Sequence, residues 1–217
     1  INFKNKDWIK NPIKYQHSIF KDLIKKGLNT RFGVDNDFKN IKSYQDFVNK
    51  VKVRDYEDIK IYIEKILSGE KNILWPGKPL YFAKTSGTTS GIKYIPITKD
   101  SIKTHINPAR DSILNYINKS GNTKIAYGKH IFIQGSPILK NKNGVLLGRL
   151  SGIAAHYVPK YMLRNRMPSW ETNSIEDWEK KVDAIVKETK DKNMTIIAGI
   201  PSWVQMYFEK ILIKTKK

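Results

Sequence analysis

The sequence predicts an α/β fold in which a helical N-terminal segment precedes part of a mostly parallel, mixed sheet with flanking helices. Up to residue 73, apolar residues recur at helical spacing, whereas beyond it short apolar runs typical of strands alternate with helical stretches. No internal repeat or low-complexity linker separates these parts. We therefore expect one partial domain over 1–217, with a helical lead-in over 1–73 and an α/β part over 74–217.

The helical lead-in is expected to begin at Asn11 and Pro12, because Asn caps helices and Pro fits the first helical position. This helix should end near Gly27. Ser43 and Asp46 have capping-box spacing ahead of another apolar stripe, which predicts a second helix.

A third helix is predicted to start at Asp55 and to stop near Gly69, since its apolar residues share one face. The turn-rich segment 74–79 then connects it to residues 80–84, a short apolar run typical of a strand. We place the start of the α/β part here.

Further along, the pattern predicts a long helix over 98–118, a strand over 130–134 and a Gly-rich segment over 144–152. Another helix is expected from Ser174, with Asp177 three residues on. Residues 194–198 are predicted to form a buried strand, followed by a turn and a last helix.

The composition excludes several classes of protein. The chain has 217 residues, 40 Lys and Arg against 20 Asp and Glu, a formal net charge of +20 and no Cys. The lack of Cys excludes disulfides and thiolate metal sites, and the apolar runs are too short to span a membrane. The charge permits a Lys-rich nucleic-acid-binding module, but only six basic residues are Arg, and the Lys are dispersed. We expect no specific nucleic-acid partner.

The segment from Thr85 to Lys93 has the composition of a phosphate-binding loop. Glycines let backbone N–H groups approach an anion, hydroxyls donate hydrogen bonds and lysine supplies charge. The spacing of Gly87, Gly91 and Lys93 does not match the Walker loop. Because residues 93–98 read as extended, we expect a strand–loop–strand hairpin.

The stretch from Thr85 to Pro96 resembles the first nucleotide-binding motif of the adenylate-forming, acyl-CoA synthetase and luciferase-like superfamily. Further segments resemble one branch of it, the bacterial members of the auxin-responsive acyl-acid amido synthetase family. These segments are 55–60, 69–70, 74–76, 93–96, 158–162, 168–169 and 199–203.

That resemblance implies an enzyme, a ligase that forms a carbon–nitrogen bond in two steps. A carboxylic acid attacks the α-phosphate of Mg-ATP to give an acyl adenylate and pyrophosphate, and an amine or amino acid then displaces AMP. Lys93 and Thr88 would be catalytic, and Mg²⁺ would arrive with ATP. The resemblance implies that the nucleotide is bound by Thr85, Ser86, Gly87, Thr88, Thr89, Ser90, Gly91 and Lys93.

The family's second and third nucleotide motifs and its small C-terminal domain match nothing before Lys217, and the chain opens on Ile1. We therefore expect an N-terminal fragment that is inactive alone and needs the missing domain in cis. We also expect the enzyme to work in the cytoplasm. An acid:thiol ligase that makes acyl-CoA remains an alternative, as does the nucleic-acid module.

Four residues are candidates for contacts to the acid. Arg110, on the helix after the loop, is suited to bind a carboxylate or else lies on the surface. Ser151 and His156 belong to a Gly-rich segment that would line the acyl pocket or form a tight turn between two strands. Ser202 follows a strand end, where α/β sheets place ligands. The four His have no metal-ligand spacing, so no protein metal site is expected.

Overall fold

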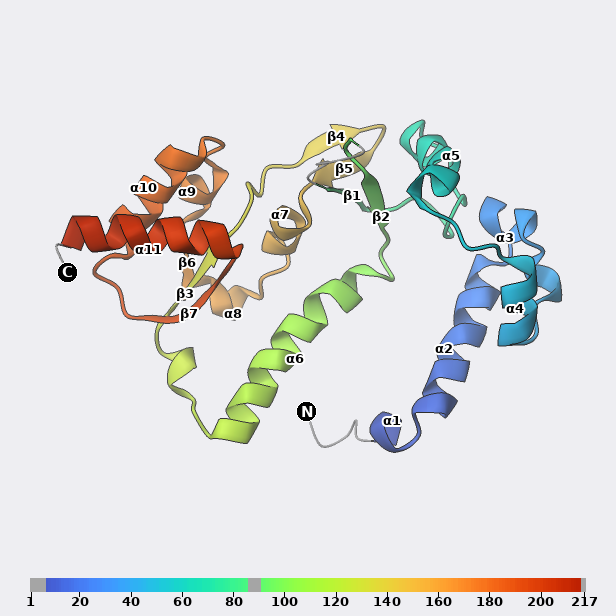
Figure 1. The fold of residues 1–217 in the computed structure, drawn as a ribbon, viewed down its shortest axis with the longest axis horizontal. Coiled ribbons are helices and arrows are strands. Elements are labelled where there is room, and N and C mark those ends of the chain that lie inside the picture. Colours follow the sequence, from blue (N-terminus) through green and yellow to red (C-terminus); the bar gives the residue numbers. More distant parts are fainter. Residues whose placement is uncertain (1–6, 86–90, 216–217) are drawn as a thin grey trace. The chain divides into compact units, whose positions relative to one another are not determined.

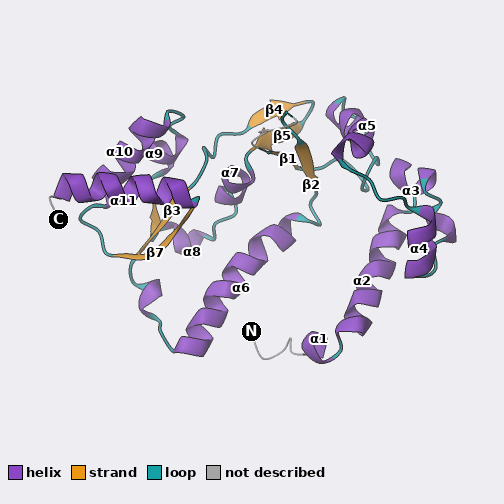
Figure 2. Ribbon diagram, in the orientation of Figure 1, coloured by secondary structure: helices purple, strands orange, loops and turns teal. Residues whose placement is uncertain are grey.

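The computed structural model describes residues 7–85 and 91–215 and confirms the α/β fold (Figures 1 and 2). The helices are α1 Asp7–Lys10, α2 Pro12–Gly27, α3 Arg31–Asp35, η1 Phe38–Asn40, α4 Tyr44–Lys50, α5 Tyr56–Leu67, α6 Ile102–Ser120, η2 Lys124–Ala126, α7 Leu150–Ala155, α8 Lys160–Leu163, α9 Trp170–Ser174, α10 Trp178–Thr189 and α11 Pro201–Thr215. The strands are β1 Tyr81–Lys84, β2 Tyr94–Ile97, β3 Lys129–Ile133, β4 Lys140–Lys142, β5 Val145–Gly148, β6 Arg166–Met167 and β7 Met194–Gly199.

The chain divides into two compact units, one of residues 1–103 with 141–147 and the other of 104–140 with 148–217. The first unit therefore joins the helical lead-in to the hairpin strands and to β4 and β5. No helix in the described part of the chain is long and apolar enough to cross a membrane.

Helix starts in the first unit follow the predicted capping signals. Pro12 opens α2, and Ser43 and Asp46 form a complete capping box at α4. Asp55 and Asp58 form a second box at α5. In each box both partners satisfy backbone N–H groups that a helix start leaves without an internal partner.

The first unit has a four-stranded sheet in the order β2-β1-β5-β4. The strands β1 and β2 pair antiparallel, with Lys84 opposite Tyr94, so the predicted hairpin is confirmed. Ile63 and Ile66 of α5 pack against Phe82 of β1 and Val145 of β5, and together they form the core of this unit.

The second unit contains a parallel three-stranded sheet in the order β6-β3-β7. Ile131 and Ile133 of β3 are buried with Val182 of α10 and Tyr207 of α11. Because successive strand residues point to opposite faces, these isoleucines leave the other face of β3 to His130, Phe132 and Gln134.

Two predicted details of the second unit are wrong. The helix expected from Ser174 begins later, with Asp177 as its N-cap accepting from the Lys180 N–H at 2.8 Å, and Ser174 ends the preceding helix α9. The strand β7 is not buried, since Ile197 is 38% exposed. In the described residues β7 pairs only with β3, so one edge and part of its surface remain open.

The Gly-rich segment after Gly148 does not form a tight turn between two strands, which was one of the two predicted possibilities. The chain passes instead from strand β5 into helix α7, with Arg149 as the N-cap of that helix.

Candidate functional site

The loop between β1 and β2 is closed at its base by a reciprocal pair of hydrogen bonds. The Thr85 N–H donates to the Lys93 main-chain oxygen at 3.0 Å, and the Lys93 N–H donates to Thr85 Oγ1 at 3.2 Å. Gly91 has φ +77°, a conformation that side chains disfavour. The other predicted nucleotide-binding residues, Ser86, Gly87, Thr88, Thr89 and Ser90, lie outside the described residues.

The exit of this loop is anchored to the first turn of α5 by Tyr56. Its hydroxyl accepts from the Tyr94 N–H at 2.8 Å, and the Lys93 ammonium lies 5.3 Å from the centre of its ring. A cation over an aromatic face is attracted by the ring's quadrupole. Tyr56 thus holds both the strand after the loop and the one lysine predicted to act in it.

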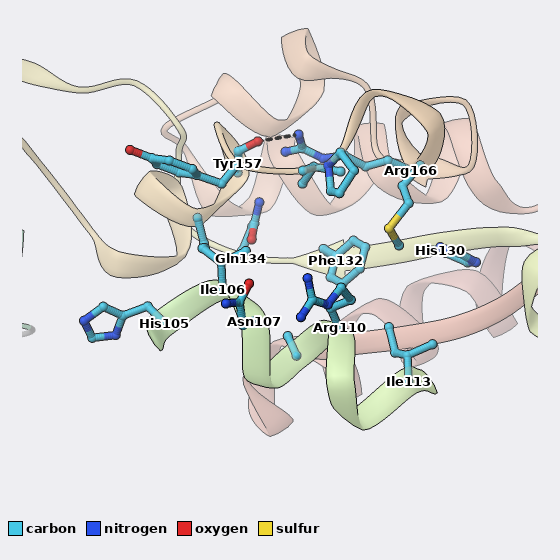
Figure 3. A pocket seen from close by; sticks show the side chains of 16 residues that line it. His105, Ile106, Asn107, Arg110, Ile113, His130, Phe132, Gln134, Tyr157 and Arg166 are labelled. Atoms are coloured by element: carbon cyan, nitrogen blue, oxygen red, sulfur yellow. Dashed lines mark hydrogen bonds between the residues drawn. The ribbon is translucent and has the colours of Figure 1, made fainter. Parts of the chain in front are cut away.

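A separate cavity of about 410 Å³ lies within the second unit (Figure 3). Its size is that of an ordinary small-molecule pocket. Most of its surface is apolar, and no Asp or Glu is among the residues that line it. These are His105, Ile106, Asn107, Ala109, Arg110, Ile113, His130, Phe132, Gln134, Ala154, Ala155, Tyr157, Val158, Pro159, Met162 and Arg166.

Sheet register explains which polar side chains reach the cavity. His130, Phe132 and Gln134 occupy alternate positions of β3 and its extension, opposite to the face that Ile131 and Ile133 bury. Arg166 of β6 is the register partner of His130, so it joins the same face. The His130 ring is fixed by a contact of 2.7 Å between Nε2 and the Ile125 main-chain oxygen.

The helix α6 contributes a second wall through Ile106, Arg110 and Ile113, which recur at helical spacing. Arg110 donates from Nε and Nη2 to Asp111 Oδ1 at 2.9 and 2.8 Å. Its side chain is 47% exposed, so its charge is both paired and hydrated.

The segment after β3 is held from several sides. The buried Lys181 ammonium donates to the main-chain oxygens of Gln134 at 2.9 Å and Asn173 at 2.6 Å. Burial, with the nearby Arg149 charge, lowers the pKa of Lys181 to about 8. His156 Nε2 lies 2.8 Å from the Pro137 oxygen. These contacts fix the end of the strand that lines the cavity.

The sequence of this chain matches a known protein family over most of its length. Residues 4–186 match the model of the GH3 family N-terminal domain. The chain belongs to the GH3 family. No curated protein sequence matches the chain.

Solved structures agree with the GH3 assignment. A GH3.15 acyl acid amido synthetase is 16% identical, with a TM-score of 0.75 over 95% of this chain. AtGH3.15 acyl acid amido synthetase in complex with 2,4-DB is 19% identical, with a TM-score of 0.68 over 92%. At such identities the likeness establishes the fold. The chain spans 37% and 35% of the lengths of these two GH3 structures.

Among the predicted acid contacts of this GH3 chain, only Arg110 lines the cavity. His156 packs edge-on against Trp170 in addition to its bond to Pro137, and Ser151 lies within α7. Ser202 is exposed in the first turn of α11; a second hollow includes its neighbours Gly199 and Pro201 but not Ser202.

The sequence analysis missed His130, Gln134 and Arg166. The alternation within 130–134 was a signal for the first two, because it separates them from the isoleucines. Arg166 carried no such signal, since a two-residue strand leaves no readable pattern. In the described part of the chain, no group of three or more His, Asp or Glu is arranged to hold a metal ion.

Proposed function

We propose that this GH3 chain is part of a ligase that activates a carboxylic acid with ATP and transfers the acyl group to an amine. The acid's carboxylate attacks the α-phosphorus of ATP, releasing pyrophosphate and forming an acyl adenylate. The nitrogen of an amine or amino acid then attacks the acyl carbon, loses a proton and displaces AMP. The observation that supports this most is the apolar cavity, which offers cations and no carboxylate to a ligand.

The hairpin loop is the proposed site for the phosphates of ATP. Three described residues of this loop fit that role. Thr85 closes the base of the loop by its bond to Lys93, and Gly91 has a positive φ that favours glycine. Lys93 directly precedes strand β2 and supplies a positive charge. Thr88 and Lys93 are the proposed catalytic residues, with Lys93 offsetting charge on the departing pyrophosphate. Mg²⁺ is proposed to enter with the nucleotide.

The cavity in the second unit is the proposed site for the acid. Phe132, Ile106 and Met162 supply apolar surface for the body of the acid. Arg110 is a candidate to bind the carboxylate of the acid. To do so, it would have to give up at least one of its hydrogen bonds to Asp111. A solved GH3 structure in complex with 2,4-DB supports a small-molecule ligand for such proteins.

We propose that a C-terminal domain in cis is needed for turnover, that this chain alone is inactive, and that the enzyme works in the cytoplasm.

Product analysis tests the acyl acceptor. The complete gene product is incubated with ATP, Mg²⁺ and a panel of carboxylic acids, with either an amino-acid mixture or coenzyme A as acceptor. The proposal predicts an amide and no thioester by mass spectrometry, together with AMP and pyrophosphate. A thioester as the main product would favour an acid:thiol ligase instead.

A further inference from the structure

Arg166 is the arginine of the cavity lining that comes from the sheet. It begins β6 and pairs in register with His130, so its side chain lies on the cavity face. In Figure 3, Arg110 and Arg166 come from different elements, and the ring of Phe132 lies between them in this view. The cavity thus has two guanidinium groups in its lining.

The guanidinium of Arg166 is incompletely bonded. Nη1 donates to the Ala155 main-chain oxygen at 3.1 Å. Nη2 is buried and has no hydrogen-bond partner in the part of the chain that the structure describes. A buried donor without a partner destabilises the folded protein, and more so when it is charged. The structure therefore leaves a donor without an acceptor, which a ligand oxygen satisfies once a small shift of the Arg166 side chain turns Nη2 toward the cavity.

Within residues 7–85 and 91–215, no carboxylate compensates the charge of Arg166. Burial lowers the pKa of its guanidinium, and no acidic group opposes that effect. The centre of the Trp170 ring lies 5.7 Å from Arg166 Cζ, so the face of the ring attracts the guanidinium charge. The ring does not, however, accept hydrogen bonds from the N–H groups in the plane of the guanidinium. The group stays protonated, because an arginine does not lose its proton in proteins.

Arg110 differs from Arg166 in this respect. Its Nε and Nη2 both donate to Asp111, and its side chain is exposed to solvent. Since the lining contains no Asp or Glu, the unneutralised charge of the cavity is that of Arg166. An anionic group gains more from an unpaired, partly buried cation than from one that a carboxylate already holds.

We propose that Arg166 binds the carboxylate of the acid through Nη2 and makes the cavity select acids over their neutral analogues. This inference rests on the proposed function, which places the acid in this cavity. A carboxylate oxygen satisfies the free donor and compensates the charge, whereas the oxygen of a primary amide satisfies the donor alone. Arg166 is therefore a specificity-determining residue, and Arg110 contributes less to this selection.

The test compares acids with their primary amides, which have nearly the same shape. Phenylacetate, octanoate, phenylacetamide and octanamide serve as probes, and their dissociation constants for the complete gene product are measured by ligand-observed NMR. The variants are Arg166→Gln, Arg166→Lys and the matched control Arg110→Gln. The amides report whether the cavity remains formed, because they do not need the charge.

The wild type is expected to bind the acids more tightly than the amides. Arg166→Gln should weaken acid binding by about tenfold, the usual effect of losing a hydrogen bond to a charged group, and change amide binding less than about twofold. Arg166→Lys should retain part of the preference, since it keeps the charge, and Arg110→Gln should have the smaller effect.

Two results would overturn the inference and leave the proposed function standing. One is a preference for acids that survives Arg166→Gln and disappears in Arg110→Gln. The other is an equal loss of acid and amide binding in both Arg166 variants, which would mean that Arg166 only supports the turn at Ala155. Binding of neither probe class by the wild type would instead contradict the proposed role of the cavity, and the inference with it.

Discussion

The Lys181 ammonium donates to the main-chain oxygen of Gln134 at 2.9 Å and so ties α10 to the end of the strand that lines the cavity. The same ammonium donates to Asn173, the penultimate residue of α9, whose side chain is itself buried without a hydrogen-bond partner among the described residues. One buried ammonium therefore serves two carbonyl groups, that of Asn173 in the interior and that of Gln134 beside the cavity.

Replacing this lysine should destabilise the protein. Lys181→Met nearly keeps the length of the side chain but leaves the buried carbonyl of Asn173 and the partly buried carbonyl of Gln134 without their donor, so we expect a loss of about 1–3 kcal/mol. Unfolding in urea measures it, with the exposed neighbour change Lys180→Met as control. Equal midpoints for the two variants would mean that the bonds of Lys181 contribute nothing.

Stability should also depend on pH through Lys181. Its pKa in the folded protein is about 8, below the ordinary 10.5. Between these two values the unfolded chain binds more protons, so the free energy of unfolding rises with pH as this group titrates. The stability difference between wild type and Lys181→Met should therefore grow between pH 7.5 and 10.5. A constant or shrinking difference would show that the lysine is not desolvated.

The turn after β3 leaves no room at Gly152. A Cβ there would lie 2.4 Å from the main-chain oxygen of Ser136. Gly152→Ala should shift this segment, cost about 1–3 kcal/mol as overpacked sites do, and weaken acid binding. Ser151→Ala on the same helix is the control, and it should change neither thermal stability nor acid binding. Normal behaviour of Gly152→Ala would show that the segment moves freely.

Tyr56 should affect ATP through Lys93. Tyr56→Leu removes the ring below the ammonium, whereas Tyr56→Phe removes only the acceptor of the Tyr94 N–H. An exposed cation–π contact of about 0.5–1 kcal/mol predicts a two- to fivefold rise in KM for ATP in the Leu variant and a smaller change in the Phe variant. Pyrophosphate-exchange kinetics measure this. Identical values for both variants would show that the ring does not position Lys93.

The capping box at α4 should make stability sensitive to acid. The N–H of Lys42, followed by the side chain and N–H of Ser43, lowers the pKa of Asp46 below its ordinary value. The stabilisation is thus present at neutral pH and lost as pH falls through the lowered pKa. Asp46→Asn should be less stable than wild type at pH 7 and similar to it at strongly acid pH, measured by thermal unfolding. A difference that persists in acid would contradict this.

Local signals in the sequence predicted several helix starts of the first unit and the hairpin. Pro12, Ser43 and Asp55 begin helices as expected, and the segment predicted to be extended after the loop forms the second strand of the hairpin, because caps and turns depend on nearby backbone groups. The exposure of β7 was not predictable, since burial of a strand depends on which strands lie beside it.

The site was predictable only in part for the same reason. Arg110 could be proposed from its place after the loop, but its bond to Asp111 and the burial of Arg166 depend on side-chain geometry and packing. His130 and Arg166 are 36 positions apart in the sequence and meet only through the register of β3 with β6.

Acid-dependent ATP–pyrophosphate exchange tests the central claim most directly. The complete gene product is assayed with Mg²⁺ and a panel of carboxylic acids, beside Ser86→Ala and Lys93→Ala. We predict exchange that requires an acid and collapses in both variants. Binding of ATP by a folded protein without exchange for any acid would contradict the claim that this GH3 protein activates carboxylic acids.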